Sequence, residues 1–153
     1  MSTREILIEQ IKTVHDENSW FVCFNYAVKN LDEKQATEKK QDQYHSISEI
    51  VQHLYFYNER YLSRFQGEEV PEKPRHYDTF QNHGNIGWEE RVTDFQMVMS
   101  LFKQELESCN EEKLKAWGET LSNLFMHNAY HIGQIVTIRK QNGWWGMNPV
   151  VKG

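Results

Sequence analysis

Apolar residues recur every three to four positions along most of the chain, and no segment alternates apolar and polar residues for long. This spacing places apolar side chains on one face of an α-helix. We therefore expect four long amphipathic helices, at about residues 3–31, 46–67, 88–108 and 118–141. Four such helices without strands predict an all-α protein with the architecture of a four-helix bundle.

The second predicted helix has a clear start and is followed by a long loop. Ser46 and Glu49 have the spacing of a capping box, in which each side chain accepts a hydrogen bond from the backbone amide of the other residue. Gly67 ends this helix. Residues 67–87 then contain two prolines and three glycines, which predict a loop. Long loops in compact domains are often functional, so this loop is a candidate part of a site.

Two histidines in the last predicted helix, His127 and His131, are the strongest chemical signal. Side chains four residues apart project side by side from a helix, so two imidazoles can hold one metal ion. They share a face with Leu124 and Ile135, so we expect them to point inward. His53, at the edge of the apolar face of the second helix, is a third candidate ligand. Three imidazoles on one ion leave positions open for water or substrate, as in catalytic sites.

Sequence spacing alone leaves another interpretation of these histidines open. Inward histidines can be core residues that bond backbone carbonyls. Position 128 is asparagine, so the HExxH motif of zinc proteases is absent. The sequence also lacks the second Glu-x-x-His motif that a di-iron site would need. The pattern therefore favours a mononuclear three-histidine site. Imidazole ligands suit Zn, Ni, Fe or Co, and the sequence does not rank these divalent metals.

Four further residues are candidates for the pocket or for support of the ligands. A metal-bound imidazole needs a hydrogen-bond partner on its other ring nitrogen. Glu49 lies one turn before His53 and Gln134 lies one turn after His131, so either could be such a partner. Tyr57 and Asn128 lie near enough in the helical projection to line a pocket. For Glu49, Tyr57 and Asn128 the sequence favours a structural role over a role in the site. No residue is identified as catalytic or as a binder of an organic cofactor.

Composition narrows the classes of function. A length of 153 residues predicts one domain, 1–153. The formal charge of −5 and the absence of a basic stripe argue against binding to nucleic acid or to an anionic membrane. No apolar run is long enough to span a bilayer. The two cysteines lie far apart with no CxxC motif or signal peptide, which predicts a reduced cytoplasmic setting. Aromatic residues make up 13%, enough to line a pocket or a subunit interface.

The order of these features resembles the DinB/YfiT-like superfamily over about residues 4–145. The matching features are His53 in a capped second helix, the proline-containing loop, a third helix led by Trp88, and His127-xxx-His131-xx-Gln134 in the last helix. The resemblance implies a DinB-type four-helix bundle with a divalent metal on His53, His127 and His131. Characterised relatives include S-transferases that use bacillithiol or related low-molecular-weight thiols, and a mycothiol-dependent isomerase. Members are often homodimers, so we expect a homodimer that acts on a small molecule.

Several functional hypotheses remain open from the sequence. The leading one is a metal-dependent thiol S-transferase, in which a divalent cation lowers the pKa of a bound thiol. Metal-assisted hydrolysis needs the same three imidazoles. A metal-binding or small-molecule-binding bundle without turnover is a third hypothesis. In the fourth, the histidines are structural and bind no metal.

Overall fold

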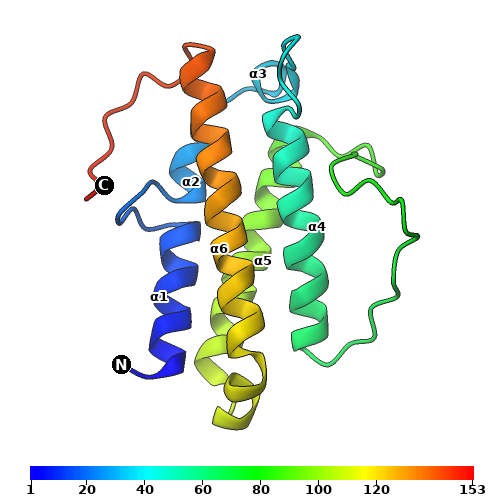
Figure 1. Cartoon of the computed structure of the whole chain (residues 1–153), viewed down its shortest axis with the longest axis vertical. Helices are drawn as coiled ribbons and strands as arrows, with labels where there is room; N and C mark the ends of the chain where they lie inside the picture. The colour runs from blue at the N-terminus through cyan, green and yellow to red at the C-terminus, as the bar shows by residue number, and fades with distance from the viewer. The chain divides into compact units, whose positions relative to one another are not determined.

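The computed structural model describes all residues, 1–153, and contains helices but no strands. The helices are α1 (Thr3–His15), α2 (Phe24–Ala27), α3 (Glu33–Thr37), α4 (Ile47–Phe65), α5 (Trp88–Ser108) and α6 (Glu111–Gln141) (Figure 1). The predicted all-α class is thus confirmed, and α1, α4, α5 and α6 are its long helices. No helix is long and apolar enough to cross a bilayer.

The chain forms two compact units, residues 1–29 with 99–153 and residues 30–98. Helix α5 starts in the second unit and ends in the first. In the first unit, α1 and α6 lie side by side (Figure 1). Gly118 permits their close approach, because a Cβ atom there would lie 3.3 Å from Cγ2 of Thr3. The core of this unit includes Phe102 and Phe125, whose rings meet edge to face with centroids 5.9 Å apart.

Arg139 ties the end of α6 to two other segments of the first unit. Its side chain is buried, with only 2% of the residue exposed. The guanidinium donates hydrogen bonds of 2.8 Å to the carbonyl oxygens of Ala27 and Lys29, and one of 2.9 Å to that of Trp144. Burial lowers the pKa of Arg139. Five fixed donors let one arginine satisfy several buried carbonyls at once.

In the second unit, α4 begins at the predicted capping box. The hydroxyl of Ser46 accepts from the amide of Glu49 at 3.0 Å, and the Glu49 carboxylate accepts from the amide of Ser46 at 3.2 Å. The helix ends before Gly67, whose φ of +89° is a conformation that glycine adopts without steric cost. Trp88, at the start of α5, donates from its indole nitrogen to the carbonyl of Leu31 at 3.1 Å.

The prediction of one first helix over residues 3–31 was wrong, because α1 ends at His15. Polar side chains after α1 offer the backbone alternative hydrogen bonds. The side chain of Asn18 accepts from the amide of Cys23 at 3.0 Å, and the amide of Ser19 donates to the carbonyl of Phe21. These bonds close a turn before the short helix α2. The expected connection over residues 32–45 also contains a short helix, α3.

The last helix begins at Glu111 rather than at Gly118, seven residues earlier than predicted. Asn110 caps it, with its side-chain oxygen accepting from the amide of Lys113 at 2.8 Å. Gly118 therefore lies inside α6, where its lack of a side chain allows the close approach of α1. Cap chemistry, rather than the glycine, sets this boundary.

Candidate metal centre

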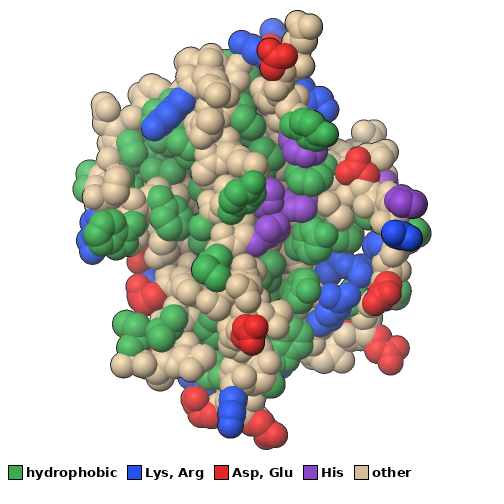
Figure 2. All heavy atoms as spheres, viewed as in Figure 1, with side chains coloured by type: hydrophobic (Ala, Val, Ile, Leu, Met, Phe, Trp, Pro, Cys, Tyr) green, Lys and Arg blue, Asp and Glu red, His purple; other side chains and the backbone are tan.

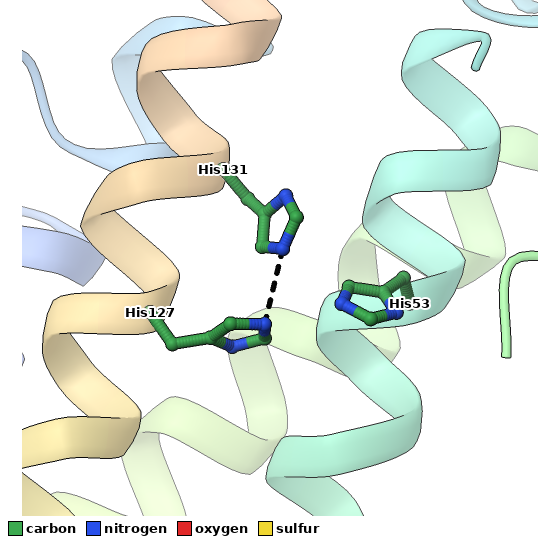
Figure 3. A group of neighbouring side chains, drawn as sticks. All are labelled: His53, His127 and His131. Atoms are coloured by element: carbon green, nitrogen blue, oxygen red, sulfur yellow. Dashed lines mark hydrogen bonds between the residues drawn. The ribbon is translucent and has the colours of Figure 1, made fainter. Parts of the chain in front are cut away.

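Helix α6 brings His127 and His131 together within the first unit. Their Nε2 atoms lie 3.0 Å apart, and the ring planes are nearly perpendicular (Figure 3). His131 is 7% exposed, whereas His127 is partly exposed. The i, i+4 spacing on one helix face is sufficient to place the two ring nitrogens against each other. Of the two imidazoles that the sequence predicted to point inward, His131 is buried and His127 is only partly so.

Gln134 determines which ring nitrogen of His131 carries the proton. Its Oε1 atom, which can only accept, lies 2.7 Å from Nδ1 of His131. His131 therefore donates from Nδ1, and in the neutral ring its Nε2 carries the lone pair. His127 donates its own Nε2 proton to that lone pair. The residue proposed from sequence as a partner of His131 thus lies within hydrogen-bond distance of its ring.

The electrostatics of the pair fit a divalent metal. Burial, and secondly the nearby His131, lower the pKa of His127 to about 4. Its ring is therefore neutral near pH 7, which is the form that ligates a metal. Imidazole nitrogens such as these two are ligands suited to Zn, Ni, Fe or Co.

The depressed pKa of His127 predicts that acid destabilises the metal-free protein. An unfolded histidine titrates near its ordinary value, about 6.5, so the unfolded state binds this proton first as the pH falls. Stability should therefore fall between about pH 6.5 and 4, by at most about 1.4 kcal/mol per pH unit from this group. Urea denaturation at several pH values measures it. The stability of the His127→Gln variant should depend less steeply on pH. Some dependence should remain, because burial also lowers the pKa of His15. Equal slopes for both proteins would contradict the prediction.

His53 lies on α4 in the second unit and is 8% exposed. Its Nδ1 atom lies 2.8 Å from the hydroxyl oxygen of Thr79. The ring of Phe80 stacks on it at 4.0 Å with the planes 5° apart, and Tyr57 meets it edge to face at 5.0 Å. Sequence reasoning named Tyr57 but missed Thr79 and Phe80. The only signal for them was that the loop is unusually long.

Each of His53, His127 and His131 offers one ring nitrogen that could ligate a metal ion. Figure 3 draws these three side chains on α4 and α6. Histidine side chains are also visible at the molecular surface on the face seen in Figure 2.

The other two residues predicted to lie near the site have other contacts. Glu49 caps α4 and lies 3.0 Å from Nζ of Lys39 and 3.5 Å from Nδ1 of His45. Partial burial alone would raise the pKa of its carboxyl group, but the hydrogen bonds with Lys39, Ser46 and His45 together lower that pKa. Asn128 is fully buried and its amide approaches the sulfur of Met99 at 3.9 Å.

A cavity of about 550 Å³ lies along another face of α6 in the first unit. Its walls include Ala129, Gly133 and Val136, together with Trp145. These α6 positions are about half a helical turn away from His127 and His131, so the cavity does not contain the histidine pair. It is a separate feature of the fold.

Comparison with known proteins gives one family. The model of the DinB superfamily matches residues 24–135, which include all three histidines and most of the chain. No curated protein and no solved structure matches the chain. Since the family model covers well over half of the sequence and the fold is all-helical, the chain belongs to the DinB superfamily.

Proposed function

We propose that this chain is a metal-dependent enzyme whose divalent ion is held by His53, His127 and His131. The observation that carries the proposal is the pair of ring nitrogens on α6, 3.0 Å apart, one of them on a ring kept neutral by burial. Membership of the DinB superfamily and the group of three histidines both fit a metal-dependent enzyme.

The proposed reaction is the transfer of a low-molecular-weight thiol to an electrophilic carbon. A divalent cation at such a site lowers the pKa of a thiol and stabilises the thiolate. The sulfur forms a bond to the carbon, the leaving group departs with its electron pair, and the thiol proton passes to solvent. The support for this reaction over others is the resemblance to the S-transferases described above.

The three imidazoles have a property that suits an anionic nucleophile. Each is a neutral ligand, so together they leave the positive charge of a cation uncancelled, unlike thiolate or carboxylate ligands. Three protein ligands also leave at least one coordination position for a small molecule. The same features would serve hydrolysis, so the test has to separate the two reactions.

The proposal predicts a conjugation activity that depends on both thiol and metal. Purified protein should accelerate the loss of a small electrophile, such as an alkyl halide or epoxide, in the presence of a low-molecular-weight thiol. Chelation should abolish the acceleration, and added Zn²⁺ or Ni²⁺ should restore it. His53→Ala should be inactive, because losing one of three ligands weakens the hold on the ion. His76→Ala, an exposed loop substitution, should keep wild-type activity.

Omitting the thiol separates the candidate reactions. Loss of the electrophile without thiol, with the same metal dependence, would favour metal-assisted hydrolysis. Activity that survives both chelation and His53→Ala would contradict a metal mechanism. Elemental analysis of protein purified without an affinity tag identifies the metal.

A further inference from the structure

The loop between α4 and α5 contacts His53 through two consecutive residues, Thr79 and Phe80. We propose that Thr79 is a positioning residue that fixes the His53 ring as a metal ligand, and that metal occupancy in turn holds this loop on α4. The contact between Thr79 and His53 lies within the second unit. The role of His53 as a ligand and the coupling of metal to the loop rest on the proposed function.

Nδ1 of His53 and the hydroxyl oxygen of Thr79 lie 2.8 Å apart, within hydrogen-bond distance, and a threonine hydroxyl can donate or accept. In the positioning role the ring N–H donates to that oxygen, which keeps the proton on Nδ1, and the tautomer measurement below tests this direction. In the neutral ring the lone pair then lies on Nε2, the nitrogen available to a metal. Ligating histidines in proteins almost always have such a partner on their other nitrogen, and it fixes both tautomer and ring orientation.

Phe80 restrains the ring in a different direction. Its ring lies between two imidazoles, stacked on His53 at 4.0 Å and on His45 at 3.8 Å, with both pairs within 5° of parallel. Stacking fixes the plane of the His53 ring, whereas the bond to Thr79 fixes rotation within that plane. The two contacts together leave the ring little freedom, which favours ligand geometry.

The segment that carries Thr79 is itself folded rather than extended. The side chain of Asp78 accepts from the amide of Phe80 at 2.9 Å, and the His83 ring donates to the carbonyl of Asp78 at 2.8 Å. The ring of Tyr77 stacks on His83 at 4.3 Å and on Phe56 of α4 at 5.4 Å. Thr79 therefore belongs to a turn that contacts α4 independently of the bond to His53.

Coupling between loop and metal follows from thermodynamic reciprocity. If Thr79 strengthens metal binding by a given factor, then bound metal strengthens the attachment of the loop by the same factor. Arg75 lies in the exposed stretch just before the turn and is a trypsin site, whereas Lys73 is protected by the following Pro74. Cleavage after Arg75 therefore reports on whether the loop is attached.

The experiment compares Thr79→Val with Thr79→Ser, which keeps the hydroxyl. Thr93→Val makes the same change at an exposed position of α5, where the hydroxyl donates to the carbonyl of Glu89. ¹⁵N NMR of the metal-free proteins reports the His53 tautomer, and competition with a chromophoric chelator reports Zn²⁺ affinity. Trypsin digestion with and without Zn²⁺ gives the rate of cleavage after Arg75. Thr79→Ala is the second hydroxyl-free variant if the valine variant misfolds.

Thr79→Val should lose the Nδ1–H preference of His53 and bind Zn²⁺ about 10–100-fold more weakly. Zn²⁺ should slow cleavage after Arg75 in the wild type and in Thr79→Ser, and much less in Thr79→Val. Thr93→Val should match the wild type throughout. If wild type and Thr79→Val bind Zn²⁺ equally and keep the same tautomer, the inference is overturned while the proposed function stands.

The two proposals fail in different ways. A wild type that binds no Zn²⁺ overturns the proposed metal site and, with it, the coupling of metal to the loop. The tautomer measurement then still decides the role of Thr79 in the metal-free protein. Loss of the Nδ1–H form in Thr79→Val supports positioning, and its retention refutes it.

Discussion

His127→Ala should remove most of the bound divalent metal while leaving the helical content unchanged. The substitution deletes one of the two ring nitrogens that face each other at 3.0 Å on α6. Losing a ligand should weaken binding by more than the roughly 10–100-fold that loss of a supporting partner costs. The fold should persist, because a chain of 153 residues forms a core without a metal staple.

Elemental analysis and circular dichroism measure the two parts of this prediction. His76→Ala removes an imidazole from an exposed loop position and should retain wild-type metal content. Full metal occupancy in His127→Ala would show that the ligand assignment is wrong. Loss of helical content would show that His127 is structural.

Arg139→Leu should destabilise the protein by about 3 kcal/mol or more. The substitution leaves the carbonyls of Ala27, Lys29 and Trp144 without their shared donor. Each unsatisfied buried polar group costs about 1–3 kcal/mol, although water entering the site would offset part of this. Arg139→Lys should recover only part of the loss, because an ammonium group lacks the planar fork of donors.

Urea denaturation gives the free energy of unfolding for these variants. Lys140→Leu is the matched control, since it removes a cationic side chain at the next, exposed position. It should change stability by less than about 0.5 kcal/mol. An Arg139→Leu variant as stable as this control would show that water replaces the guanidinium without cost.

Two helix boundaries with strong sequence signals were predictable, whereas the end of α1 and the start of α6 at the Asn110 cap were not. The stripe led by Trp88 predicted α5 at its observed ends, and the Ser46 capping box predicted the start of α4. Apolar spacing continues past His15, but Asn18 bonds the amide of Cys23 and turns the chain. Helical periodicity carries no information about that bond, so the first helix was predicted too long.

The candidate site, too, was predictable from the sequence only in part. An i, i+4 spacing contains enough geometry to predict that His127 and His131 lie together, because one helix carries both. Thr79 is 26 residues away from His53 along the chain, in a loop with no periodic pattern. Its contact with His53 therefore could not be predicted from the sequence. The assignment of His53 to the same ion as the α6 pair stays a prediction that the variants above test.

The hydrogen bond between the two histidines of α6 makes metal uptake a rearrangement of protons. In the structure, Nε2 of His127 carries a proton and donates a hydrogen bond to Nε2 of His131. For that same nitrogen to become a ligand, the proton has to move to the other side of the His127 ring. The ring stays neutral throughout, so near pH 7 this step moves a proton without releasing one to the buffer. A bound ion would therefore compete with an internal hydrogen bond rather than with a charge.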